Sequence, residues 1–355
     1  MHFMHLLIVT QKVDKNDPIL GFFHRWIIEF TKHCERIDVI CLWEGEHDFQ
    51  SDRWCGPVKN VHIHSLGKER GLSKMVQLFR FWRFCRELSF AADGIFVHMN
   101  AVYVLLGWPW WKKKKVFLWR NHPQGSIVAR IAYALADRIF YTSPQAHAAQ
   151  YPRALKMPAG IDTEFFKRDM AIERKPNSIL CLGRISSIKR IEVVIEAAKK
   201  LEADGAAFIL HIIGSPLTDK DAVYEKKLRQ QAQELVERGK IVFLPAVTQA
   251  EAVRLYNEHE IFINATPTGS FDKTVLEAMA CESIVIAANT SFEDLIRPEQ
   301  RFPQDDAKAL ADRLKQACGL SSDQKASMAR EVGQAVSMRH GLAGLVGAIK
   351  KAYER

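Results

Sequence analysis

The sequence lacks the features of a membrane-spanning or disulfide-bonded secreted protein. No apolar run approaches the roughly 18 residues that a spanning helix needs. The opening stretch, MHFMHLLIVTQKVDK, has a short apolar run with no small-residue cleavage site after it, so it predicts a first β-strand and no signal peptide. The seven cysteines are odd in number and show no CxxC or zinc-type spacing, which indicates reduced thiols in a cytoplasmic protein.

Several common catalytic and nucleotide-binding motifs are also absent. No GxGxxG or GxxxxGK[ST] loop follows a predicted strand, and no GxSxG occurs. An Asp-x-Asp pair, Asp219 and Asp221, lies near the start of a predicted helix, where acidic residues favour the first turn. We therefore expect no metal site.

The chain has a formal net charge of +9 over 355 residues, and most of this excess lies in the N-terminal half. All eight tryptophans, Trp26 to Trp119, lie in the same half. A basic, tryptophan-rich half suggests contact with phosphates, anionic lipid or nucleic acid. No nucleic-acid recognition motif is present, so we expect no nucleic-acid partner.

Short apolar runs alternate with helical patterns along the whole chain, which predicts two doubly wound α/β domains with parallel sheets. The charged stretch 162–177 separates them and reads as a linker. The expected organisation is an N-terminal domain over 1–161, a linker over 162–177, a C-terminal domain over 178–338, and a helix over 339–355 that packs back on the N-terminal domain. Ligands of such sheets bind where the strands end, so these positions are the candidates for a site.

Two cations follow the first strand of the C-terminal domain, in GRISSIKR (183–190). Gly183 permits a tight turn, and Arg184 and Lys189 bracket the loop that enters the next helix. Point charge, a fork of donors and a helix N-terminus together suit a diphosphate. On spacing alone, two solvated loop cations are an equal alternative.

A second candidate lies in PTGSFDKTVLEAMACESIVIAAN (267–289), where a strand runs into a Gly/Ser loop and then a helix. The first amides of that helix can donate to phosphate oxygens. Glu277, about one turn inside, can accept hydrogen bonds from both hydroxyls of a ribose. An acidic residue near a helix N-terminus is also an ordinary stabilising choice.

The two motifs together, GRISSIKRIEVVIEAAKKL and GSFDKTVLEAMACESIVIAAN, resemble glycosyltransferase family 4, which has the GT-B fold, and the resemblance covers most of residues 155–290. It implies two Rossmann-like domains with an interdomain cleft, a nucleotide-sugar co-substrate (UDP- or GDP-sugar), no other cofactor and no metal. It implies that Arg184 and Lys189 hold the donor diphosphate and that Glu277 binds the donor ribose. The further donor-side positions implied are Gly183, Gly214, Ala246, Val247, Thr274 and Val275.

One departure from the family pattern concerns the sugar end of this site. The family often has a glutamate eight residues before the conserved one, and Gly269 stands there in this chain. The segment Ser270, Phe271, Asp272 and Lys273 must then supply the contact to the donor sugar, with Asp272 or Lys273 as candidates. A subset of the family resembles this chain here, which implies altered donor handling.

The N-terminal half offers the acceptor side of the predicted site. His98 ends the run GIFVHM and resembles a cleft histidine of the family, so we count it with Arg184, Lys189, Asp272 and Glu277 as catalytic. His122 follows another strand, and Gly21 lies in the long loop after the first strand.

The run WPWWKKKK is the most unusual surface candidate. Tryptophan beside lysine suits contact with an anionic membrane surface. The residues concerned are Trp108, Trp110, Trp111, Lys112, Lys113, Lys114 and Lys115. A buried aromatic cluster beside a solvated lysine run is an equal alternative.

The resemblance therefore implies a retaining, hexosyl-type glycosyltransferase that uses a nucleoside-diphosphate sugar and a glycan or glycolipid acceptor. Bacterial surface polysaccharide or lipopolysaccharide synthesis is the expected setting, in the cytoplasm or at the inner face of the plasma membrane. A non-catalytic GT-B-like partner protein that binds a nucleotide sugar is the alternative, because Gly269 replaces the family's glutamate.

Overall fold

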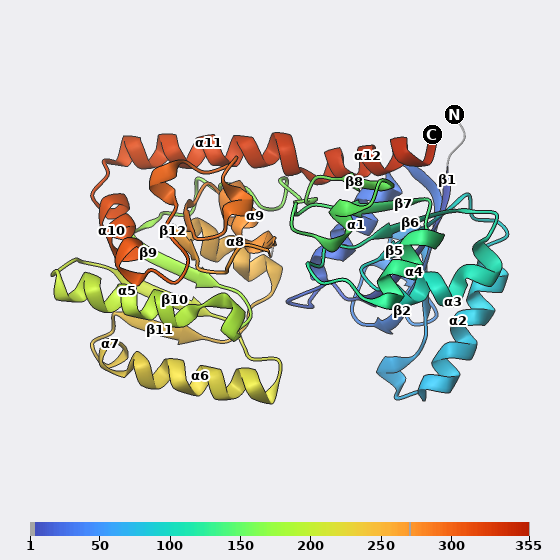
Figure 1. The fold of residues 1–355 in the computed structure, drawn as a ribbon, viewed down its shortest axis with the longest axis horizontal. Helices are drawn as coiled ribbons and strands as arrows, with labels where there is room; N and C mark the ends of the chain where they lie inside the picture. Colours follow the sequence, from blue (N-terminus) through green and yellow to red (C-terminus); the bar gives the residue numbers. More distant parts are fainter. Residues whose placement is uncertain (1–3, 270, 355) are drawn as a thin grey trace. The chain divides into compact units, whose positions relative to one another are not determined.

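The computed structural model describes residues 4–269 and 271–354 and divides the chain into two compact units. Unit 1 comprises residues 1–160 and 342–355, and unit 2 comprises residues 161–341. Each unit is built on its own parallel sheet with helices on both faces (Figure 1). The predicted α/β class with two doubly wound domains is confirmed.

The sheet of unit 1 has the strand order β3-β4-β2-β1-β5-β6-β7-β8, and the pairings between these strands are parallel. Its strands are β1 (Met4–Val13), β2 (Cys34–Glu44), β3 (Phe49–Ser51), β4 (Val58–Ser65), β5 (Gly94–His98), β6 (Lys115–Trp119), β7 (Arg138–Tyr141) and β8 (Ala154–Lys156). The chain adds strands to one side of β1 and then, from β5 onward, to the other. The carboxyl ends of β1 and β5 therefore flank the point where the strand order reverses.

Successive residues of β1 face two different cores. Leu6 and Ile8 pack with α1 (Gly21–Thr31) and the C-terminal helix α12 (Leu342–Glu354), whereas Leu7 and Val9 pack with the helices of the opposite face. Those helices are α2 (Lys74–Leu88), α3 (Val102–Trp111) and α4 (Ile127–Leu135). Side chains of a strand alternate between faces, so continuous apolar runs mark strands that are buried on both.

The sheet of unit 2 has the order β11-β10-β9-β12-β13 and parallel pairings between its strands. Its strands are β9 (Lys175–Leu182), β10 (Ile209–Ile213), β11 (Ile241–Leu244), β12 (His259–Asn264) and β13 (Ile284–Ala287). Here β9 and β12 flank the reversal of strand order, so the loops that follow these two strands converge at the expected ligand position.

Helices cover both faces of the second sheet. The helix α5 contacts α6 and α10, and α9 contacts α8 and α11. These helices, together with the short α7, are α5 (Ile191–Ala203), α6 (Asp219–Gln231), α7 (Gln233–Glu237), α8 (Gln249–Glu258), α9 (Lys273–Ala280), α10 (Ala307–Cys318) and α11 (Ser322–His340). Polar side chains cap the N-termini of two of these helices. Thr248 and Glu251 form a capping box at the start of α8, and Thr218 accepts a hydrogen bond from the Asp221 amide at the start of α6.

Some elements differ from the sequence prediction. The stretch predicted as a linker lies within unit 2, where Arg168 and Asp169 both donate hydrogen bonds to the side-chain oxygen of Asn257. The last helix begins at Leu342, after α11 has ended at His340. The helix α3 was not predicted, because Pro109 inside it masks the helical pattern.

Candidate functional site

The loops after β9 and β12 meet through one carboxylate. Asp272, the residue before α9, accepts hydrogen bonds at Oδ2 from Lys189 Nζ at 2.6 Å, from Asn264 Nδ2 at 2.9 Å and from Thr266 Oγ1 at 2.8 Å. Lys189 belongs to the loop after β9, in the short helix Ser187–Lys189, whereas Asn264 and Thr266 come from the end of β12. The structure thus brings together two segments that lie about 80 residues apart in sequence.

This arrangement fixes the charge state of Asp272. Burial acts to raise its pKa, but the nearby Lys189 ammonium and the hydrogen bonds hold that pKa below its ordinary value. The carboxylate therefore stays ionised at neutral pH and holds Lys189 in place. Asp272 and Lys189 were both predicted from the sequence. Asn264 and Thr266 were not, because their only signal was their position at the end of a buried strand.

Arg184 lies in the same loop but behaves differently. Its side chain is exposed, and among the described residues it makes no hydrogen bond, ion pair or ring contact. The neighbouring Arg190 has φ +51° and pairs with Glu192 and Asp305. Arg184 is therefore the cation of this loop that has its full set of donors open to a ligand.

The N-terminus of α9 has no side-chain cap. Asp272 occupies the cap position, yet its carboxylate makes no capping hydrogen bond and is directed to Lys189 instead. The first turn contains no acidic residue and includes Lys273 and Thr274. A helix start with no side-chain cap and with positive partial charge suits an anion. Burial lowers the pKa of Lys273 well below its ordinary value, against the opposing charge of Glu277.

Glu277 lies inside α9 and is almost completely buried, with 8% of its surface exposed. The hydroxyl of Tyr256 on α8 donates to Glu277 Oε2 at 3.1 Å. Burial, followed by the Glu277 charge, raises the pKa of Tyr256 well above its ordinary value, so this phenol remains a donor. Tyr256 was not predicted from the sequence, because an aromatic residue on an amphipathic helix is typical of any core.

Three strand ends of unit 2 approach each other closely. The amide of Gly183 donates to the Ile213 carbonyl and the amide of Gly214 to the Leu244 carbonyl, each at 3.0 Å. A Cβ on Gly214 would lie 1.9 Å from the carbonyl oxygen of Gly183, so only glycine fits there. Ala246, which donates to Ser215 Oγ at 2.9 Å, and Val247 follow β11 at the same edge of the sheet.

Gly269 has a conformational reason to be glycine. Its φ is +115°, a value that L-residues rarely adopt, although a Cβ there would meet no described atom within 4 Å. A glutamate at this position would strain the loop. Ser270 lies outside the described residues, and Phe271 contacts the rings of Phe292 and His340 at 4.9 and 5.6 Å between centroids. Val275 is fully buried in α9.

In unit 1, His98 ends β5 beside the strand-order reversal, as predicted. Its Nδ1 lies 3.2 Å from Thr10 Oγ1 of β1, and its ring stacks on Phe23 of α1 at 4.0 Å between centroids. Only 2% of the residue is exposed, so a packed aromatic cluster surrounds the imidazole. The position matches the sequence prediction, but the burial places His98 among structural contacts within unit 1.

The other two acceptor-side candidates lie in a loop and at a helix start of unit 1. His122 is exposed, and its Nδ1 accepts a hydrogen bond from the Gln124 amide at 3.0 Å. Gly21 is the first residue of α1, and a Cβ there would lie 3.0 Å from the Lys15 carbonyl oxygen. The carboxylate of Asp17 accepts hydrogen bonds from the two amides just before that helix, at Ile19 and Leu20.

The predicted membrane motif, residues 108–115, lies partly in α3, which ends at Trp111. Trp111 is fully buried and donates from Nε1 to Ser89 Oγ at 2.9 Å, so its assignment to the surface was wrong. Lys114 donates to the backbone carbonyls of Phe90 and Ala92, and Lys115 to that of Tyr353. Trp108 and Trp110 are half-buried, and Lys112 and Lys113 are exposed. The helix turns its residues in different directions, which a linear motif does not show.

Residues 4–269 and 271–354 contain no group of three or more His, Cys, Asp or Glu side chains placed to hold a metal ion. They also form no helix with the length and apolar character needed to cross a membrane.

Part of this chain is similar to known glycosyltransferases. Residues 162–334 match the family model described as glycosyl transferases group 1. The putative colanic acid biosynthesis glycosyltransferase WcaL of Escherichia coli is 24% identical over 189 residues, or 50% of this chain and 45% of WcaL. A D-inositol 3-phosphate glycosyltransferase of Geodermatophilus obscurus is 28% identical over 155 residues, or 40% and 34% of the two chains. The chain thus spans less than half the length of these relatives.

A solved structure is similar in fold to this chain over both of its units. Anabaena Alr3699/HepE, determined with UDP and with UDP-glucose, has TM-scores of 0.75 and 0.73 at 15% identity. The UDP complex covers 99% of this chain and 100% of the other. The likeness to this solved structure, at 15% identity, establishes the fold alone. The family to which the C-terminal unit is similar comes from the match of residues 162–334. Residues 162–334 therefore belong to the group 1 glycosyl transferases, and the chain that carries them has the GT-B fold.

Proposed function

We propose that the chain transfers a hexose from a UDP- or GDP-sugar to a hydroxyl of a glycan or glycolipid, with retention of anomeric configuration. The observation that carries the proposal is the convergence, at one end of the unit 2 sheet, of two cations, an uncapped helix start and a buried carboxylate. These are the parts that a nucleoside diphosphate requires.

Each part of this edge has a separate task. Arg184 and the ammonium of Lys189 neutralise the diphosphate, and the first amides of α9 donate to its oxygens. Glu277, held by Tyr256, accepts the ribose hydroxyls. Because Asp272 accepts hydrogen bonds from Lys189, Asn264 and Thr266, we assign it as a positioning residue that acts through Lys189.

The reaction needs charge stabilisation more than covalent chemistry from the protein. The acceptor oxygen bonds to the anomeric carbon, while the bond from that carbon to the phosphate oxygen breaks. The acceptor proton passes to the leaving diphosphate on the same face of the sugar. The cations stabilise the charge that develops on the leaving group.

The acceptor belongs, in this proposal, to the synthesis of a bacterial surface polysaccharide or lipopolysaccharide. The partial likeness to WcaL, whose name refers to colanic acid, supports this class. The protein itself lies, in this proposal, peripherally at the inner face of the plasma membrane. The exposed Lys112 and Lys113 support membrane contact, and so do the exposed Met75 and Phe79 of α2, since Trp82 contacts both Phe79 and Trp110.

The proposal is tested by mixing the protein with UDP- and GDP-hexoses and saccharide or glycolipid acceptors, and measuring free nucleoside diphosphate. Acceptor-dependent release supports it, and NMR of the new glycosidic linkage reports retention or inversion. The alternative is a non-catalytic partner protein, which Gly269 suggests because it stands in place of the family's glutamate. Tight binding of a nucleotide sugar, without release of nucleoside diphosphate across a broad panel of acceptors, would favour this alternative. Sedimentation with phosphatidylglycerol vesicles, but not with phosphatidylcholine vesicles, tests the membrane contact.

A further inference from the structure

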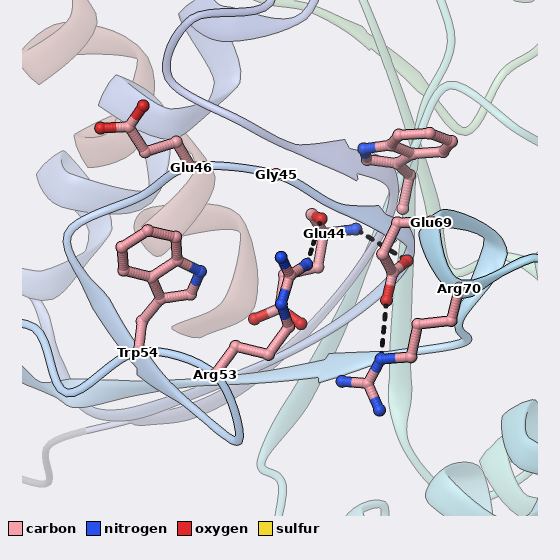
Figure 2. Close-up of a pocket in the computed structure, with 8 residues that line it drawn as sticks. Glu44, Gly45, Glu46, Arg53, Trp54, Glu69 and Arg70 are labelled. Carbon is pink, nitrogen blue, oxygen red and sulfur yellow. Dashed lines mark hydrogen bonds and ion pairs between the residues drawn. The ribbon is translucent and has the colours of Figure 1, made fainter.

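A pocket of about 490 Å³ lies in unit 1 at the carboxyl ends of β2 and β4 (Figure 2). Its lining residues come from the end of β2, the loops before and after the short strand β3, and the short helix Lys68–Arg70 after β4. They are Trp43, Glu44, Gly45, Glu46, Arg53, Trp54, Glu69 and Arg70. The volume lies within the range of small-molecule sites, and the position is the ligand-binding edge of a parallel sheet.

Two indole rings give the pocket its apolar surface. Trp43 is 37% exposed and Trp54 is 38% exposed, so both large rings present part of their surface to solvent. Lys12 Nζ lies 5.3 Å from the centroid of the Trp43 ring. The electron-rich face of an aromatic ring attracts the slightly positive C–H groups on one face of a sugar ring. Partly exposed tryptophans therefore favour a saccharide over a fully apolar ligand.

The polar side chains around the rings are held in a fixed framework. Arg53 donates to the Glu44 carbonyl at 3.0 Å, and Arg70 Nε lies 3.3 Å from Glu69 Oε1 (Figure 2). The Glu69 carboxylate also accepts from the Glu44 amide at 3.2 Å and from the hydroxyl of Ser65. A guanidinium has five N–H donors, so both arginines retain donors for a ligand.

The floor of the pocket is joined to the loop after β1. The Gly45 amide donates to the Val13 carbonyl, and the Lys15 amide donates to the Glu46 carbonyl, both at 2.8 Å. A Cβ on Gly45 would lie 2.3 Å from the carboxylate of Asp14, so the two loops approach too closely for a larger residue. The pocket is thus pre-formed, which lowers the entropy lost on binding.

The balance of charges indicates a neutral ligand. The acidic residues Glu46 and Glu69 and the basic residues Arg53 and Arg70 line the pocket, so its charges balance. Glu44 also lines it, but its carboxylate is 1% exposed and lies 3.0 Å from His47 Nε2. Sugar hydroxyls both donate and accept, so they can use carboxylates and guanidiniums together. We propose that this pocket binds a neutral sugar residue of the acceptor glycan, as a saccharide subsite of unit 1. The proposal rests on the glycosyltransferase function proposed above and names the chemistry of its acceptor.

The test uses the full-length protein and neutral disaccharides, namely maltose, cellobiose, lactose and mannobiose. Saturation-transfer NMR should show magnetisation passing to the ring C–H protons of at least one of them. Trp54→Ala should weaken that binding roughly tenfold, which corresponds to about 1.4 kcal/mol. Trp54 lies in a loop, so the variant should fold, and Trp43→Ala should have a similar effect. Trp110→Ala, a partly exposed tryptophan on α3, is the matched control.

Separate measurements distinguish failure of this proposal from failure of the proposed function. UDP and GDP binding, measured by calorimetry, should be the same in wild type, Trp54→Ala and Trp110→Ala. The pocket proposal is overturned if no disaccharide shows saturation transfer, or if the signal survives in folded Trp54→Ala and Trp43→Ala. Absence of nucleotide binding in the wild type would instead overturn the proposed function, whatever the disaccharides show.

Discussion

Substitution of Arg184 by alanine is the sharpest test of the donor site, because this side chain has no structural task that the structure shows. It is exposed and makes no contact of the kinds described above with another described residue. Surface substitutions of this kind change the free energy of unfolding by no more than about 0.5 kcal/mol. A change in nucleotide binding on Arg184→Ala would therefore report a contact with the ligand itself.

The magnitude follows from the chemistry of an arginine–phosphate contact. A hydrogen bond to a charged group contributes about 1.5 to 3 kcal/mol, and each 1.4 kcal/mol corresponds to a tenfold change in affinity. Arg184→Ala should thus weaken UDP or GDP binding by roughly ten- to a hundredfold. Raising the salt concentration should reduce the difference between wild type and variant, because added ions screen an exposed charge.

The assay is isothermal titration calorimetry with UDP and GDP, together with thermal unfolding of each protein. Arg330→Ala is the matched control: Arg330 is also exposed, lies within α11 and makes no such contact with another described residue. The reasoning is refuted if folded Arg184→Ala binds the nucleotide as tightly as wild type. Equal weakening in both variants would refute it too, since a general charge effect would then explain the loss.

Three further substitutions test other parts of the structure. Lys189→Ala should reduce nucleotide binding and also lower the melting temperature, because Asp272 loses its ion-pair partner; an unchanged melting temperature would contradict that role. Gly214→Ala should destabilise unit 2 by about 3 kcal/mol in denaturant unfolding, since its Cβ would overlap the Gly183 carbonyl, and a fully stable variant would contradict the close approach. Burial acts to raise the pKa of Asp38, but hydrogen bonds from His5, His64 and Arg36 hold that pKa below its ordinary value. The ionised Asp38 therefore stabilises the fold fully above about pH 4, and this contribution is lost as the pH falls below that value. Asp38→Asn should lower stability at pH 7 by about 2 to 3 kcal/mol and show less acid sensitivity than wild type; parallel stability curves would contradict this.

The sequence by itself determined the class of fold and the order of its parts. Short continuous apolar runs indicate strands buried on both faces, and their alternation with helical patterns leaves few topologies. Pro109 concealed α3, because a proline inside a helix contradicts the local pattern that prediction uses. The cations and the carboxylates near α9 were found from motifs at strand ends, where the topology itself places ligands.

Only the tertiary structure decided which of these side chains meet and which are buried. Contacts such as Lys189 with Asp272 or Glu277 with Tyr256 join segments whose separation in sequence carries no signal of contact. Burial also depends on the faces that neighbouring helices cover, which is why Trp111 and His98 lie inside unit 1 although their sequence contexts suggested accessible sites. The saccharide pocket proposed around Trp43 and Trp54 arises in the same way, from two loops that the sheet brings together at one edge.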